Sequence, residues 1–217
     1  PLDKDRWKIV YKILIDYKKN KKIKKIGVSV YNKDEIKNIL EVFRPDIIQF
    51  PFNVLNQTFD SNFLKYLKHK KILLQARSIF LQGLLINKVK NKYFDIWKKN
   101  FDMWDKHTKY SSKNKLSQCL SLILDNQYID SVVVGVESID QIKQIIGLFK
   151  SKKLTPDISD LSEFKTSDEY LIDPRLWKKN KNFDEKKKWN ERCKYIFNGG
   201  MLISKNPNQF LPGKWPS

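Results

Sequence analysis

The sequence has few of the residues on which several classes of protein depend. Its 217 residues include only two cysteines, two histidines and seven glycines. Neither Cys119 nor Cys193 belongs to a C-x-x-C motif or has a histidine at metal-ligand spacing, which excludes a disulfide framework and the common zinc motifs. Because Cys119 falls in an apolar helical run, we expect a buried and unreactive thiol there.

Long apolar runs and several short functional motifs are absent as well. No stretch approaches the roughly 20 apolar residues that a membrane-spanning helix needs, and no secretory signal follows Pro1. The patterns G-x-G-x-x-G, G-x-S-x-G, H-E-x-x-H and the P-loop do not occur. We therefore expect a cytoplasmic protein with no metal site and no membrane partner.

The chain does carry a large excess of positive charge, +19 at neutral pH. Such a charge is typical of nucleic-acid-binding proteins, but nearly all of it comes from lysines scattered over helix faces. Dedicated readers of nucleic acid rely on arginine forks. The arginines here are few and dispersed: Arg6, Arg44, Arg77, Arg175 and Arg192. We expect a solvated surface and no nucleic-acid partner, and keep nucleic-acid binding as the less favoured alternative.

Apolar spacing predicts strands that alternate with helices. Short apolar runs rich in β-branched residues are typical of buried strands, and they cover residues 26–30, 46–50, 72–79 and 131–136. Apolar residues at helical spacing predict a helix at 5–22 and three helices that begin at the caps Asn32, Ser61 and Ser138. Two more helical segments, near 89–106 and 113–125, fall in an insertion between the third and fourth strands. The alternation predicts an α/β fold with a parallel sheet. Four such units amount to half of a (β/α)8 TIM barrel; a doubly wound sheet is the alternative.

The composition changes along the chain and predicts three parts. Residues 1–150 form the partial barrel. Residues 151–195 are polar, charged and weakly periodic, which favours an irregular C-terminal arm that acts as a linker or wraps the barrel. Residues 196–217 combine aromatic residues with glycine and proline, and are too short for a domain of their own.

Polar residues at the ends of the predicted strands are the candidates for function, because βα loops collect function in parallel barrels. Ser29 and Gln49 close the first two strands. Arg77 closes the third, where it could bind a phosphate or carboxylate or form an ordinary ion pair. Ser138 either caps its helix alone or also binds a phosphate at the helix N-terminus.

Four segments together resemble strands five to eight of aldo-keto reductases, in family order and with family spacing. They are Ile26–Tyr31, Asp46–Asn53, Arg77–Leu85 and Ile129–Ser138. The resemblance implies an NAD(P)H-dependent reductase of carbonyl substrates. It also implies that the chain is the C-terminal half of the barrel, with an N-terminal half-barrel upstream. The catalytic Tyr, Lys, Asp and His of the family lie on the earlier strands, so we assign no catalytic residue here.

The same resemblance implies three groups of cofactor contacts. Ser29 and Gln49 match positions that hold the nicotinamide carboxamide. Arg77 stands where the family usually has an aromatic ring that stacks on the nicotinamide. The pyrophosphate and adenosine-phosphate segments contribute Ser78, Phe80, Gln82, Gly83, Gly135, Ser138 and Gln141. The cofactor is NADP or NAD, since the basic residues that favour NADP in the family are absent near Ser138.

Other interpretations remain open at this point. Asn198–Lys205 and Phe210–Pro216 resemble the start of a class III, glutamate-1-semialdehyde aminomutase-like aminotransferase. That resemblance implies a reductase–aminotransferase fusion suited to sugar or surface-polysaccharide synthesis. The main alternative is a non-catalytic nicotinamide-nucleotide-binding or regulatory module on a degenerate barrel. A further one is a small α/β protein that pairs two half-barrels as a homodimer.

Overall fold

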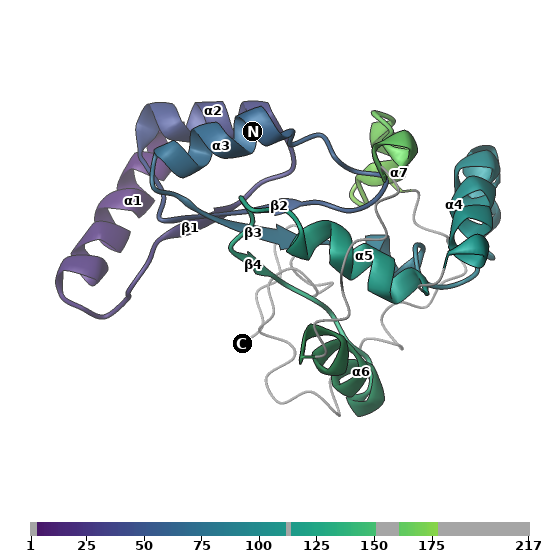
Figure 1. The fold of residues 1–217 in the computed structure, drawn as a ribbon. Coiled ribbons are helices and arrows are strands. Elements are labelled where there is room, and N and C mark those ends of the chain that lie inside the picture. The colour runs from purple at the N-terminus through teal and green to yellow at the C-terminus, as the bar shows by residue number, and fades with distance from the viewer. Residues whose placement is uncertain (1–3, 112–113, 151–160, 178–217) are drawn as a thin grey trace, which may run out of the picture. The chain divides into compact units, whose positions relative to one another are not determined.

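The structure is a computed structural model that describes residues 4–111, 114–150 and 161–177. The chain divides into two compact units, Pro1–Leu176 and Trp177–Ser217, and the fold below is that of the first unit. Figure 1 shows its elements. In chain order they are α1 (Lys4–Lys19), β1 (Gly27–Ser29), α2 (Lys33–Val42), β2 (Ile47–Pro51), α3 (Ser61–His69), β3 (Leu73–Arg77), η1 (Leu81–Gly83), η2 (Lys92–Trp97), α4 (Lys98–Tyr110), α5 (Lys115–Leu124), β4 (Ser131–Val132), α6 (Ile139–Lys150), η3 (Leu161–Phe164) and α7 (Glu169–Ile172).

The four strands form one parallel sheet in the order β1-β2-β3-β4. Each strand returns through a helical crossover, as the alternation of apolar runs predicts. The predicted α/β fold with a partial barrel is therefore confirmed. The fourth strand is shorter than predicted, because only Ser131 and Val132 pair with β3.

The two faces of the sheet differ in burial. Val28, Ile48, Phe50, Leu74 and Ala76 are buried on one face, at 8% exposure or less. Figure 1 shows α2 and α3 together along one face of the sheet. The strand residues that alternate with these buried ones, such as Ser29, Gln49 and Gln75, point to the other face and are only partly buried or exposed. A parallel sheet normally has both faces covered or closes into a barrel. The described residues leave this second face only partly covered, and we call it the open face.

A repeated ionic contact lies at the amino-terminal ends of the strands. The Asp46 carboxylate accepts hydrogen bonds from the backbone N–H of Ile26 at 2.7 Å and from Lys18 Nζ at 2.7 Å. The Asp130 carboxylate likewise accepts from the backbone N–H of Leu74 at 2.7 Å and from Lys68 Nζ at 2.6 Å. Each aspartate thus ties the start of a strand to its neighbour and to a helix. Burial raises the pKa of Asp46, but the contacts with Lys18 and Ile26 outweigh it and leave that pKa below its ordinary value.

The helix boundaries correct one sequence prediction. Ser61 is not the N-cap of α3: that position is Asp60, whose side chain accepts from the backbone N–H of Phe63. Aspartate and serine are equally good N-caps, so the sequence leaves the choice open within one residue. Helix α2 ends at Val42, before Pro45, while Asn32 caps its start as predicted and accepts from Glu35 N at 2.8 Å.

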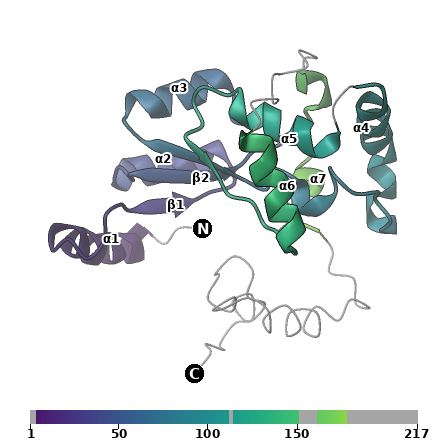
Figure 2. The same cartoon turned by 60° about the horizontal axis from the view of Figure 1, so that its bottom comes forward.

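The apolar stripe of α6 is less buried than its spacing predicts. Ile145 is buried, whereas Ile142, Ile146 and Phe149 are 41%, 44% and 39% exposed. Helix α1 likewise exposes Ile9 and Ile13, at 62% and 51%. These two helices flank the sheet at its two ends and lie apart in both views (Figures 1 and 2). The described residues thus cover only part of each apolar face: Trp7 and Tyr11 of α1 stack on Phe43, and Ile145 of α6 is buried.

Residues 161–176 contact the loop after β2, the helix η2 and the helix α4. Phe164, Leu171 and Ile172 are buried. Trp97 Nε1 donates a 2.7 Å hydrogen bond to Asp168. The backbone N–H of Thr166 donates to the Leu55 carbonyl at 2.9 Å. The tail 196–217, including the segments that resemble an aminotransferase, and Cys193 lie outside the described residues.

The predicted burial of Cys119 is confirmed. Its side chain is 1% exposed in the middle of α5. Burial raises the pKa of the thiol to about 12, so it is protonated at neutral pH and unreactive as a nucleophile.

Candidate functional site

A continuous row of hydrogen-bonded polar side chains crosses the open face of the sheet. Strand register aligns Ser29, Gln49, Gln75 and Ser131, one from each strand. Ser29 Oγ donates to Gln49 Oε1 at 3.1 Å. Gln49 Nε2 donates to Gln75 Oε1 at 2.8 Å, and Gln75 Nε2 donates to Ser131 Oγ at 3.1 Å. We call these four residues the polar ladder.

Arg77 joins the first end of the polar ladder. It closes β3, and its Nε donates to Ser29 Oγ at 3.2 Å. Its Nη1 donates to Ser78 Oγ at 3.3 Å and its Nη2 to the Val30 carbonyl at 3.1 Å. Among the described residues, the guanidinium forms these hydrogen bonds and no ion pair. It braces the carboxyl ends of β1 and β3 instead.

One aromatic ring lies against two guanidinium groups beside this end of the ladder. Arg77 Cζ lies 4.1 Å from the ring centroid of Tyr31, and Arg175 Cζ lies 3.4 Å from it. Arg175 is also paired with Asp173 at 2.7 Å and with Glu35 at 3.7 Å. Partial burial lowers the pKa of Arg175, but Asp173 outweighs this and holds that pKa above its ordinary value. Both guanidinium groups thus lie within cation–π distance of one ring, and the charge of Arg175 is balanced by its two carboxylates.

The loop after β3 has an unusual backbone. Ser78, Leu81 and Gln82 have φ values of 57°, 44° and 55°, and Gly83 follows at 87°. Non-glycine residues in this region are uncommon and cost free energy, so such strain persists only where surrounding contacts hold it. Strained segments of this kind are concentrated in ligand-binding loops.

A buried amide anchors that loop. Asn53 is 1% exposed, and its Nδ2 donates to the Ser78 carbonyl at 3.1 Å. Its Oδ1 accepts from the backbone N–H groups of Leu55 at 3.0 Å and Asn56 at 2.9 Å. Asn53 thereby ties the loop after β2 to the loop after β3.

The remaining predicted residues lie on adjacent loops. Phe80 is buried, whereas Gln82 is exposed on η1 and Gly83 is partly exposed. Gly135 and Ser138 lie on the exposed segment between β4 and α6.

Ser138 and Gln141 are engaged in capping. Ser138 Oγ accepts from Gln141 N at 3.2 Å, and Gln141 Oε1 accepts from Glu137 N at 2.7 Å. This confirms the predicted cap, while the Ser138 hydroxyl proton stays available to a ligand. The structure therefore joins Ser29, Gln49, Arg77 and Ser78 by hydrogen bonds, and leaves Ser138 and Gln141 on a neighbouring loop.

Three residues of the site escaped the sequence analysis. Gln75 and Ser131 complete the polar ladder, and Arg175 completes the stack on Tyr31. Gln75 had a usable signal, because it occupies the same alternate position in β3 that Gln49 occupies in β2. Arg175 had none, because it reaches Tyr31 only through the fold.

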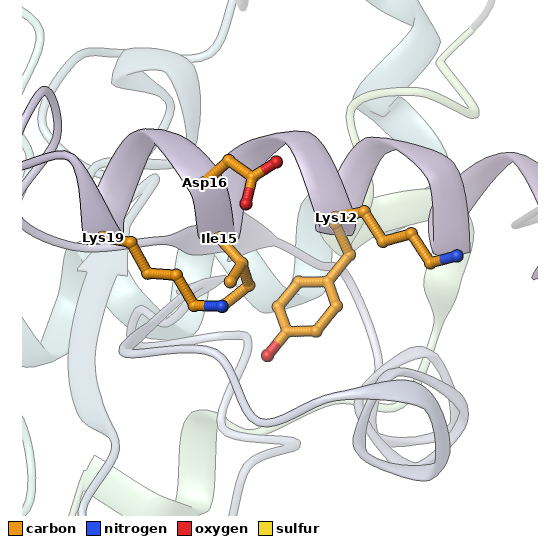
Figure 3. A pocket seen from close by; sticks show the side chains of 5 residues that line it. Lys12, Ile15, Asp16 and Lys19 are labelled. Carbon is orange, nitrogen blue, oxygen red and sulfur yellow. The ribbon is translucent and has the colours of Figure 1, made fainter.

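A shallow hollow of about 330 Å³ runs along α1, the helix that precedes β1. Tyr11, Lys12, Ile15, Asp16 and Lys19 line it. Figure 3 shows the four labelled side chains rising from that one helix. A ligand site requires groups that converge from several elements, so this hollow is a surface feature of the helix.

Within residues 4–111, 114–150 and 161–177, no group of three or more His, Cys, Asp or Glu could hold a metal ion. In the same residues, no helix combines the length and the apolar character that crossing a bilayer demands.

Comparison with known proteins identifies the family. The family model described as the aldo/keto reductase family matches residues 6–167. The chain belongs to the aldo/keto reductase family. The match includes all four strands, the polar ladder and Arg77.

Solved aldo/keto reductases share the fold. The aldo-keto reductase AKR11C1 from Bacillus halodurans in its apo form has a TM-score of 0.56 and 16% identity, over 69% of this chain and 52% of that one. Its holo form has a TM-score of 0.56 and 14% identity, over 75% of this chain and 56% of that one. The chain thus spans about half the length of these aldo/keto reductases. At this identity the likeness concerns the fold alone.

Proposed function

We propose that this chain supplies the nicotinamide-nucleotide-binding half of an NAD(P)H-dependent aldo/keto reductase. The observation that carries the proposal is the hydrogen-bonded pair of Ser29, which ends β1, and Gln49, which lies in the middle of β2 and is level with Ser29 in the strand register. In parallel barrels the ligand site lies at the carboxyl ends of the strands. A hydroxyl and a primary amide side by side match the donor and acceptor of a carboxamide.

The residues present fit such a cofactor. Ser29 and Gln49 would hold the nicotinamide carboxamide, and the guanidinium of Arg77 would stack on the ring in place of an aromatic side chain. The strained loop would face the pyrophosphate; its residues are Ser78, Phe80, Gln82 and Gly83. Ser138 at the start of α6 would face the adenosine phosphate, with Gly135 and Gln141 beside it. No lysine or arginine lies between Gly135 and Gln141, so both NAD and NADP are candidates.

The bound cofactor would supply a hydride to the carbonyl carbon of an aldehyde or ketone. This half orients the nicotinamide through Ser29 and Gln49 and raises the positive potential beside the ring through Arg77. The proton donor, a tyrosine in this proposal, belongs to the other half of the barrel. We therefore expect the 217 residues alone to bind the nucleotide without reducing any carbonyl substrate.

We propose that four further βα units, encoded upstream of Pro1, complete the barrel. The open face supports this, as do the exposed apolar faces of α1 and α6 at the two ends of the sheet. The coding DNA upstream of Pro1 tests it. Strand–helix units carrying Asp, Tyr, Lys and His at their strand ends would support a working reductase. Units without those residues would remove the catalytic proposal.

The nucleotide site itself is tested by titrating the purified full-length protein with NADPH and with NADH and following nicotinamide fluorescence. Gln49→Leu removes both groups that face the carboxamide and should weaken binding at least tenfold. Gln127→Leu is a matched control, because Gln127 is exposed in the turn before β4, at the amino-terminal end of the sheet. Equal affinity in wild type and Gln49→Leu would contradict the proposed carboxamide contact.

Arg77 favours the second candidate function, a nucleotide-binding or regulatory module without catalysis. Hydride transfer turns a neutral dihydronicotinamide into a cation, and a guanidinium beside it opposes that change. Such a site would hold the reduced cofactor and resist its oxidation. Tight binding without turnover in the full-length protein would select this function, and carbonyl-dependent oxidation of NADPH would select the reductase.

Two finer parts of the proposal concern the context of the whole protein. We propose a reductase–aminotransferase fusion in sugar or surface-polysaccharide synthesis, on the strength of the tail segment Asn198–Lys205, which lies outside the described residues. We also propose a cytoplasmic location, where the NAD(P)H pool that such a reductase uses is found. The DNA downstream of Ser217 tests the fusion: an aminotransferase domain with its pyridoxal-phosphate lysine supports it, and a stop codon removes it.

A further inference from the structure

The polar ladder has a direction. Each of its hydrogen bonds is donated toward β4: Ser29 to Gln49, Gln49 to Gln75, and Gln75 to Ser131. Both amides therefore turn their oxygen toward β1 and their nitrogen toward β4. In serine and glutamine each polar group could serve in either direction, so the residues of the ladder do not by themselves impose this order.

Arg77 supplies the asymmetry. A guanidinium has donors only, so Ser29 Oγ accepts from Arg77 and is left with its single proton to donate to Gln49. If the hydrogen bonds of the ladder ran in the opposite direction, Arg77 and Gln49 would both donate to Ser29 Oγ. The Ser29 hydroxyl proton would then have no partner in the ladder. The opposite direction would also turn the positive ends of both amide dipoles toward the cation. The observed direction avoids both costs.

The next contact along the ladder then fixes Gln49. Gln75 Oε1 takes one N–H of Gln49 at 2.8 Å, the shortest of the three contacts. Gln49 is left with one free lone pair on Oε1, on the β1 side, and one free N–H on Nε2, on the β3 side. A ligand carboxamide pairs with that arrangement in one orientation, with its own N–H toward Oε1 and its oxygen toward Nε2.

We propose that Gln75 is a positioning residue that holds the Gln49 amide in this one orientation, so that the site selects a ligand with a carboxamide N–H over the corresponding methyl ketone. This rests on the proposed function, because Gln49 is there the carboxamide contact. Gln75 itself acts through Gln49.

Two variants of similar side-chain volume separate the effect of the hydrogen-bond acceptor of Gln75 from the effect of its size. Gln75→Glu keeps an acceptor for Gln49 Nε2 and so keeps the orientation. Gln75→Met fills similar space without an acceptor, so Ser29 is then the only ladder residue that orients the Gln49 amide. Gln127→Met, in the exposed turn before β4, is the control for replacing a glutamine by methionine.

The measurement is the ratio of dissociation constants for two reduced nucleotides, NADPH and its 3-acetylpyridine analogue, with the full-length protein. The analogue replaces the carboxamide NH₂ by CH₃, and the two ligands carry the same charge, so general effects of a variant cancel in the ratio. We expect wild type to prefer NADPH about tenfold, the effect of one hydrogen bond. Gln75→Glu and Gln127→Met should keep that preference within about threefold, and Gln75→Met should lower it by more than threefold, because Gln49 is then oriented by Ser29 alone.

The outcomes distinguish this inference from the proposed function. If wild type binds NADPH but Gln75→Met keeps the tenfold preference, the positioning role of Gln75 is overturned while the nucleotide site stands. If Gln75→Glu loses the preference as fully as Gln75→Met, Gln75 acts through packing and the inference is again overturned. If wild type binds neither nucleotide, the proposed function fails and the inference with it. Thermal unfolding followed by circular dichroism confirms that each variant is folded before it is titrated.

Discussion

The strained loop after β3 depends on one buried amide, and replacing it tests how the candidate site is held. Asn53→Ala removes the donor to the Ser78 carbonyl and the acceptor shared by Leu55 N and Asn56 N. Alanine fills less of the space and offers no polar group. Because Asn53 is 1% exposed, water cannot readily take over these contacts.

The expected cost follows from the three hydrogen bonds. Each contributes roughly 0.5–1.5 kcal/mol net, so their loss lowers the free energy of unfolding by about 3 kcal/mol. Urea unfolding followed by circular dichroism measures this as a fall in the midpoint at unchanged m-value. Asn62→Ala is the matched control, because Asn62 is exposed in the first turn of α3 and should change stability by no more than about 0.5 kcal/mol.

Asn53→Ala should also loosen the loop that it anchors. Limited proteolysis of the folded variant should cut between Ser78 and Gly83, where the wild type resists, because release from Asn53 lets the positive-φ residues relax. A loss below about 1 kcal/mol together with an unchanged cleavage pattern would refute the reasoning that Asn53 holds the strained backbone in place.

Three further predictions follow from charge and burial. Folding lowers the pKa of Asp46, so this carboxylate stabilises the fold at pH values above its unfolded pKa near 3.8, and the stabilisation is lost as pH falls through the lower folded pKa. The free energy of unfolding in urea should therefore fall less between pH 6 and pH 3 in Asp46→Asn than in wild type. Cys119, with a thiol pKa raised to about 12, should stay unmodified by iodoacetamide at pH 8 in the folded protein and react after unfolding, and peptide mass spectrometry that finds it alkylated in the native state would contradict its burial. Arg77→Tyr replaces a cation by a neutral aromatic ring, so the affinity ratio of NADPH to NADP⁺ should fall about tenfold, the effect of roughly 1.4 kcal/mol; an unchanged ratio in fluorescence and calorimetric titrations would place Arg77 away from the nicotinamide.

The sequence predicts the elements of the fold well, because each strand and helix carries its own periodic signal. The strand at Ile47–Pro51 and the cap at Asn32 are local features, set by β-branched residues and by one amide next to a helix start. The exposure of Ile142 and Ile146 could not be predicted in this way. Helical spacing reveals an apolar face, but not whether a neighbour covers it.

The residues of the candidate site likewise differ in whether the local sequence or a distant contact determines them. Ser29 and Gln49 could be selected from sequence because they are polar residues on predicted strands and match a family pattern. The strain at Ser78 and Gln82 could not, because positive φ at non-glycine positions is imposed by contacts such as that of Asn53, 25 residues away in sequence from Ser78. The stacking of Arg175 on Tyr31 joins two segments that no local pattern relates.

The open face changes chemical character from one end of the strands to the other. The register row Gly27–Ile47–Leu73 is apolar, and the next row on the same face, two residues along each strand, is the polar ladder that starts at Ser29. The interior of a barrel is ordinarily filled by branched apolar side chains, which the first row supplies in part. In a closed barrel, the polar groups of this row that the ladder does not pair would need other polar partners.

The two ends of the strands also differ in what their polar contacts do: those at the amino-terminal ends join strands to helices, and those at the carboxyl ends form the candidate site. Asp46 and Asp130 tie the strands together at their amino-terminal ends, through backbone N–H groups and lysines that no ligand needs to displace. At the carboxyl ends, Arg77 gives the row of amides a direction and the loop after β3 stores strain. A ligand at that end meets donors and acceptors that are already oriented, so the cost of ordering them falls on folding and not on binding.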